Sequence, residues 1–244
     1  MKKFLILISM FLFFKINAQN TENELIILLK EIENSEFASE ERNLLEEQFI
    51  LKFQQIIEDN QTLHYEELEQ NYIFVNSYKS TNKKYLIYSI GGSKISKHYN
   101  FVLQLNEEQK YAVLYKSSSD FYHFKEIHDL GNNHFLIIQQ LDDLSFSCYE
   151  AQVFSAEKEQ VVLKNAFRKN DEKLSVCSFT RVVGLDGMEY YAPIKINFDP
   201  KNKEIFYSFK TWNPKKRQEK TITRKTKYKK GKFNILDYDE RIFE

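Results

Sequence analysis

The stretch QEKTITRKTKYKKGKF, residues 218–233, decides the fold class most directly. Between Thr221 and Lys229 its side chains form two alternating sets. One set is Thr221, Thr223, Lys225, Lys227 and Lys229, and the other is Ile222, Arg224, Thr226 and Tyr228. Because successive side chains of a β-strand point to opposite faces, this period of two predicts a strand with two different faces. The pair Lys230-Gly231 then predicts a tight turn into a further strand.

The same period extends back to Tyr72. It predicts strands over residues 72–78, 84–90, 99–105, 110–116, 121–128, 134–141, 145–155, 160–166, 174–183, 189–198, 203–211, 218–229 and 233–238. Pairs such as Gly91-Gly92 and Asn132-Asn133 mark turns between them. Links this short favour antiparallel pairing, since parallel crossovers need about a dozen residues or more. Residues 72–244 are therefore expected to form an antiparallel β domain, with a sandwich, a barrel and an incomplete propeller all open.

Residues 19–71 are predicted to be an acidic helical segment. Thr21 with Glu24 fits a capping box, and Ser39 marks a second helix start. Apolar residues follow each start at helical spacing, so we expect two helices joined near Asn34-Ser35 and a further helical turn within 62–69. The whole chain is thus expected to be mainly β with an N-terminal helical segment.

Residues 1–18 have the three parts of a secretory signal peptide. Lys2 and Lys3 give a positive start, Phe4 to Phe14 is apolar apart from Ser9, and Ala18 precedes the expected cleavage site. The apolar run is much shorter than the roughly 20 residues of a transmembrane helix. We therefore predict an exported protein, periplasmic or extracellular, with no membrane span once the signal peptide is removed.

A run ending Asn17-Ala18-Gln19 resembles signal peptides of Bacteroidetes-type bacteria. Residues 80–103 are similar to a segment of uncharacterised exported proteins from such bacteria, over about a tenth of the chain. The resemblance implies export and no particular activity.

The composition suits a packed domain and argues against one class of partner. Hydrophobic residues make up 42% of the 244 residues. Removing residues 1–18 takes away three lysines and leaves 35 − 3 = 32 basic against 35 acidic residues, a net charge of −3. A net charge this close to zero gives no general attraction to nucleic acid, which is therefore an unlikely partner.

Export places the two cysteines in an oxidising compartment, where disulfides persist. Cys148 and Cys177 both fall in predicted strands. A disulfide between them and two separate buried thiols both remain open.

Charge is distributed unevenly along the chain. Residues 21–71 hold 14 acids and three bases, whereas residues 210–232 hold 11 bases and the single acid Glu219. Lys225, Lys227 and Lys229 share one strand face and form a cationic ladder, which Lys230 and Lys232 extend around the turn. A candidate polyanion site comprises Arg224, Lys225, Lys227, Lys229, Lys230 and Lys232. Two other interpretations are protection of a sheet edge by lysines and pairing with the acidic helices.

No residue pattern indicates a metal, a cofactor or a catalytic centre. His123 and His128 differ by an odd number, so without a bulge they point to opposite faces of a strand and do not share a metal. Ser80 to Lys83 matches Ser-x-x-Lys but falls in an expected turn. Paired acids occur at Glu66-Glu67, at Asp142-Asp143 and at Asp237 with Asp239.

The sequence therefore favours a non-enzymatic binding or interaction module of the cell envelope. Its expected partner is an acidic polymer or an envelope protein. The alternative is an envelope hydrolase whose active site has no recognisable motif.

Overall fold

The computed structural model describes residues 23–37, 39–59, 65–142, 146–157, 160–167, 171–179, 181–182, 188–189, 195–213 and 218–233. The expected signal peptide and residues 234–244 lie outside this part. No helix within the described residues is both long and apolar enough to cross a membrane.

The helical segment forms as the sequence predicts. Residues 23–34 are helical, α2 spans Glu40–Glu58 and α3 spans Tyr65–Gln70. Ser39 caps α2, since its side chain accepts a hydrogen bond of 3.1 Å from the backbone N–H of Arg42. Leu29 and Phe53 are fully buried, so the apolar stripes of both helices face a core.

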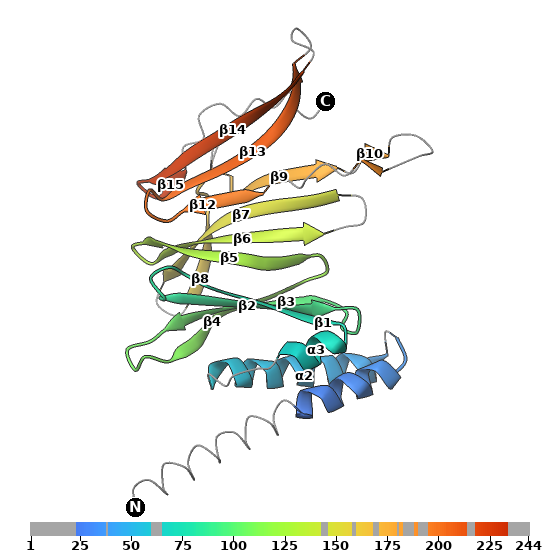
Figure 1. Ribbon diagram of the computed structural model, residues 1–244. Coiled ribbons are helices and arrows are strands. Elements are labelled where there is room, and N and C mark those ends of the chain that lie inside the picture. Colours follow the sequence, from blue (N-terminus) through green and yellow to red (C-terminus); the bar gives the residue numbers. More distant parts are fainter. Residues whose placement is uncertain are drawn as a thin grey trace, which may run out of the picture. The chain divides into compact units, whose positions relative to one another are not determined.

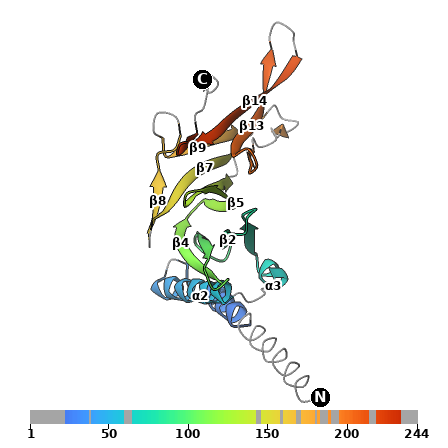
Figure 2. The same ribbon diagram turned by 90° about the vertical axis from the view of Figure 1, so that its left-hand side faces the viewer.

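Four strands follow in chain order and form the first sheet: β1 (Ile73–Lys79), β2 (Tyr85–Gly92), β3 (His98–Leu105) and β4 (Tyr111–Ser119). α2 packs against this sheet (Figure 2). The Phe53 ring lies 6.0 Å from the ring of Tyr88 and 5.8 Å from that of Phe101.

The second sheet contains β5 (Tyr122–Gly131), β6 (His134–Asp142), β7 (Phe146–Glu157), β8 (Gln160–Lys164) and β9 (Lys173–Phe179). β6 pairs with one edge of β7. The other edge is shared, because β9 pairs with residues 146–152 and β8 with residues 153–157 (Figure 1). All these pairs are antiparallel.

The third sheet has the order β12 (Ile196–Asp199), β13 (Glu204–Asn213), β14 (Gln218–Lys229) and β15 (Lys232–Phe233). A separate two-stranded sheet pairs β10 (Arg181–Val182) with β11 (Met188–Glu189).

A hydrophobic core joins the second and third sheets. Leu136, Ile138 and Val153 come from the second sheet, and Ile205 and Phe233 from the third. Two antiparallel sheets packed face to face make a sandwich. This confirms the predicted mainly β fold with N-terminal helices, and of the three architectures left open it is the sandwich that fits.

The chain falls into two compact units. One comprises residues 1–76 and 88–120, and the other residues 77–87 and 121–244. The helical segment thus shares a unit with most of the first sheet, whereas the sequence places a boundary between residues 71 and 72. The physical reason is that α2 completes its core only against the first sheet.

Candidate functional site

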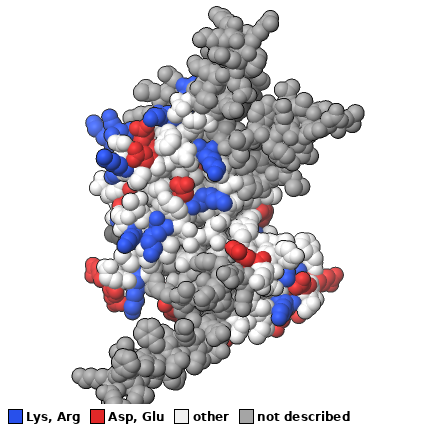
Figure 3. Space-filling model, viewed as in Figure 1, with Lys and Arg blue, Asp and Glu red and all other residues white. Residues whose placement is uncertain are grey.

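The lysines of β14 share one exposed face, as the alternation predicts. Lys225, Lys227 and Lys229 are exposed, whereas Thr226 between them is buried. We call Lys225, Lys227, Lys229 and Lys232 the lysine face. Figure 3 shows basic side chains gathering at the level of β14 and β15, with acidic atoms close by.

β15 adds a lysine directly across from β14. Lys229 and Lys232 are register partners in the antiparallel pair, so their side chains leave the same face about 5 Å apart at Cβ. The turn that joins them has positive φ at both Lys230 (50°) and Gly231 (83°). This two-residue turn places Lys229 and Lys232 side by side across the strand pair.

Two acids lie on the same face. Glu204 of β13 is the register partner of Lys227 and of Asp199 on β12. The Nζ atom of Lys225 lies 3.8 Å from Oε1 of Glu204. The acids therefore sit beside Lys225 and Lys227.

Arg224 is not part of this face. It is partly buried and lies on the face that also carries Thr226 and Tyr228. The structure thus groups four of the five lysines of the candidate site on one face. Arg224 and the turn residue Lys230 are not part of that face.

β14 leaves much of one edge without a strand partner within the described residues. It pairs with β13 from Gln218 to Lys227 and with β15 only at Tyr228 and Lys229. This topology agrees with the interpretation that lysines protect a sheet edge. The acidic helices have ion pairs of their own inside the first unit, where Lys94 binds Glu33 at 2.8 Å and Lys52 binds Glu24.

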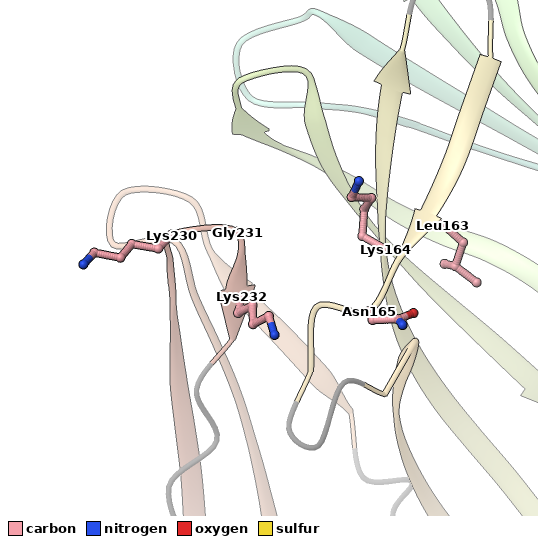
Figure 4. A pocket seen from close by; sticks show the side chains of 6 residues that line it. All are labelled: Leu163, Lys164, Asn165, Lys230, Gly231 and Lys232. Carbon is pink, nitrogen blue, oxygen red and sulfur yellow. The ribbon is translucent and has the colours of Figure 1, made fainter.

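A pocket of about 420 Å³ opens beside the turn, and we call it the corner pocket. It is lined by Leu163, Lys164, Asn165, Lys230, Gly231 and Lys232. Figure 4 shows Lys232 extending toward Asn165, whereas Lys230 extends away from β8. Lys164 and Asn165 were not among the residues predicted from sequence, because nothing local links β8 to a turn more than 60 residues later.

A neutral histidine lies close to Lys164. The Nδ1 atom of His134 lies 2.6 Å from the hydroxyl of Tyr228. Burial lowers the pKa of His134, Lys164 lowers it further, and Glu157 opposes them. Burial also raises the pKa of Tyr228 to about 12. The imidazole tautomer decides which of the two groups donates in this hydrogen bond.

The structure joins Cys148 and Cys177 in a disulfide, with 4.1 Å between their Cα atoms. The two residues are register partners in β7 and β9. The bridge therefore fastens β9 to β7 near the end where β9 leads to β10.

A buried carboxylate that sequence reasoning missed lies on β7. One oxygen of Glu150 accepts hydrogen bonds from Lys173 (2.7 Å), Ser175 (2.8 Å) and Tyr122 (3.2 Å). The other accepts from Gln139 at 3.0 Å. Burial alone raises the pKa of Glu150, but the bonds from Lys173, Ser175 and Gln139 outweigh it and leave the pKa lowered. All of these groups satisfy one another, so the cluster joins β5, β6, β7 and β9 rather than facing a ligand.

The expectation for the histidines of β5 applied to a strand without a bulge, and β5 has a bulge between the two residues. The register skips Lys125, so His123 partners Gln140 and His128 partners Leu136, both even-numbered residues of β6. This β-bulge puts the two histidines on the same face. Their partners on β6, Gln140 and Leu136, are still four residues apart. No group of three or more metal-binding side chains occurs within the described residues.

The other motifs have structural roles or fall outside the described residues. Ser80 lies in the β1–β2 turn as expected, where its Oγ accepts from the N–H of Tyr85 at 2.9 Å and closes the hairpin. Asp237 and Asp239 lie outside the described residues, as does Asp143 of the pair with Asp142.

The sequence matches no protein-family model, and a search of curated proteins finds no significant similarity.

Proposed function

We propose that the protein is an exported, non-enzymatic binding module of the cell envelope whose lysine face binds an acidic polymer. The observation that carries the proposal is the cross-strand pair Lys229–Lys232. Like charges placed directly opposite each other destabilise a sheet. Protecting an edge does not require such a pair, whereas a polymer of negative charge would relieve its repulsion.

The spacing of the lysines supports a polymer rather than a single small anion. Side chains two apart on a strand repeat at roughly 6.8 Å. Lys225, Lys227 and Lys229 therefore form an exposed row that matches repeated charges along a chain. The ligand class is an acidic polysaccharide or another polymer with one negative group per repeating unit.

Two observations support export. The first 18 residues have the pattern of a signal peptide, and the Cys148–Cys177 disulfide suits an oxidising compartment. The ligand is therefore sought among polymers of the cell envelope.

The first experiment measures the thermal stability of residues 19–244 with a panel of ligands. Dextran sulfate and polyglutamate are the polyanions, neutral dextran is the uncharged control, and each is tested at low and moderate salt. A polymer at 100 times its dissociation constant adds about 2.7 kcal/mol, which raises Tm by roughly 5–10 °C for a chain of this size. Stabilisation by the polyanions alone, fading with salt, supports the proposal.

A triple variant assigns the site. Replacing Lys225, Lys227 and Lys229 by Ser should abolish most of the shift without unfolding the domain. A matched control replaces Lys195 and Lys201, which lie outside the lysine face, and should keep it. An unchanged shift in the triple variant contradicts the site, and stabilisation by the neutral sugar would favour the alternative of an envelope hydrolase.

A further inference from the structure

The outward side of α2 carries leucines where a surface helix normally carries polar side chains. Leu44 is 54% exposed and Leu51 is 61% exposed. They lie seven residues apart, close to two helical turns, so both point to the same side at about 10.5 Å from each other along the helix axis. Phe53 lies on the opposite side, where it is fully buried against the first sheet.

These leucines belong to a wider gathering of exposed apolar side chains. Of the seven large hydrophobic side chains exposed in the described part of the chain, four lie between residues 27 and 51: Ile27, Phe37, Leu44 and Leu51. Glu24 of helix 23–34 pairs with Lys52 of α2. The guanidinium of Arg42 donates to the carbonyl of Ile32 at 3.0 Å, so the two helices lie side by side and antiparallel. Exposed hydrophobic residues that gather in this way are typical of a surface that a partner covers.

Two acids flank the leucines on the same side of α2. Glu40 lies four residues before Leu44 and Glu47 three residues after it, and these spacings place side chains on one helix face. Both acids are exposed, and neither has an ion pair within the described residues. Ion pairs neutralise three other acids of the helical segment: Glu24, Glu33 and Glu46. We call Glu40, Leu44, Glu47 and Leu51 the outer face of α2.

The charge of the outer face argues against three occupants. A second copy would meet it with the same patch, as in a twofold dimer, and packing Leu44 against Leu51 of the copy would bring two Glu47 side chains together. The lysine face of a second copy supplies charge, but no large hydrophobic side chain is exposed on the described parts of β14 and β15. Helices that lie on anionic membranes carry Lys and Arg rather than Glu. The occupant therefore combines positive charge with apolar side chains.

The spacing of the two leucines indicates a helical partner. On a strand, side chains of one face repeat at about 6.8 or 13.6 Å, and neither distance matches the ~10.5 Å between Leu44 and Leu51. On a second helix, residues seven apart repeat at that same distance on one face.

We propose that the outer face of α2 binds a cationic amphipathic helix of a partner protein. Apolar side chains of that helix cover Leu44 and Leu51, and its Lys or Arg side chains pair with Glu40 and Glu47. The outer face belongs to the unit that does not contain the lysine face, so this interaction does not depend on the polymer.

The test measures binding of a fluorescent synthetic peptide to the purified protein, residues 19–244, by anisotropy. The peptide is an amphipathic helix of about three heptads with Leu on one face and Lys on the other, so the lysine face does not attract it. Replacing Leu44 and Leu51 together by Ser should weaken binding about tenfold. The matched control replaces Phe121 and Val162, which are exposed apolar residues outside the helices, by Ser and should change binding less than about twofold.

The contribution of charge is tested in the same way. Glu40→Gln combined with Glu47→Gln should weaken peptide binding about fivefold. Glu107→Gln combined with Glu108→Gln removes the same charge from exposed residues between β3 and β4 and should change binding less than about twofold. Equal losses in these two variants would overturn the proposal and indicate only general attraction to acids.

Further results would also overturn the proposal. They are no binding of the peptide to the unmodified protein, no loss in the variant that lacks Leu44 and Leu51, and equal binding of a peptide with Glu in place of Lys. A dimer in sedimentation equilibrium that the same leucine variant dissociates would assign the outer face to self-association instead. If the leucine variant does not fold, the glutamine variants carry the test, because they keep both leucines.

Discussion

At the scale of single residues, the proposed function gives the Lys229–Lys232 pair both a cost in stability and a role in binding. Its like charges face each other across β14 and β15. Reversing one charge should therefore improve the fold and harm the function, a combination that a purely structural lysine would not show.

Lys229→Glu should stabilise the protein by about 0.5 kcal/mol, since it turns repulsion with Lys232 into attraction. Affinity for dextran sulfate should fall at the same time. Urea denaturation and a binding titration measure the two effects. Lys225→Glu is the matched control, because Lys225 lies beside Glu204 and the same change there should destabilise; a loss of stability in Lys229→Glu would contradict the account.

Glu150 makes stability depend on pH. Its pKa is lowered in the folded protein, so it stabilises the fold above its unfolded pKa of about 4.3. That contribution is lost as the pH falls through the lower, folded pKa. Glu150→Gln should cost about 2 kcal/mol at pH 7, because donors are left without their charged acceptor. The difference from the unmodified protein should shrink below pH 4 in urea denaturation, and a constant difference would count against this assignment.

At the scale of elements, the disulfide links β9 to β7, a strand whose edge β9 shares with β8. β9 pairs with only the first part of β7, because β8 occupies the rest of that edge. The bridge closes a loop between residues separated by 29 positions, and on the chain-entropy model this stabilises by roughly 3.5 kcal/mol.

Replacing Cys148 and Cys177 together by Ala should remove about 3 kcal/mol from the free energy of unfolding. Dithiothreitol should lower the stability of the unmodified protein by a similar amount and leave the double variant unchanged. Equal sensitivity of both proteins to the reductant would mean that the loss has another cause.

The elements also show which features can be predicted from the sequence. In β14 burial alternates as the period of two predicts, because one face is exposed and the other is covered. In β2 and β3 consecutive residues are buried, so burial does not alternate in those strands. The bulge at Lys125 leaves no such mark, since one extra residue shifts the period without changing the composition. The end of β8 and the β14–β15 turn are joined by a long-range hydrogen bond, from the N–H of Phe233 to the carbonyl of Ala166, that no local pattern encodes.

At the scale of the whole molecule, the proposed binding in the envelope requires export. Expressed with its own leader in a bacterium, the protein should be recovered from the periplasm or the medium with Gln19 as its first residue. N-terminal sequencing and intact mass measure this. Recovery from the cytoplasm with residues 1–18 still attached would contradict export.

The protein has a net charge near zero, but four of its lysines are gathered on the lysine face. Attraction at long range should therefore be weak, and the proposed binding relies on direct contact with the lysine face. Each contact releases counterions from the polymer, so the affinity falls with salt in proportion to the number of lysines engaged.

The most direct test of the lysine face is thus the slope of log affinity for dextran sulfate against log salt concentration. Each lysine contact contributes about 0.7–0.9 to the slope on charged polymers. Replacing Lys225, Lys227 and Lys229 by Ser should reduce its magnitude by about 2, while replacing Lys195 and Lys201 should leave it unchanged. An identical slope in the triple variant would show that the polymer binds elsewhere and would contradict the proposed function.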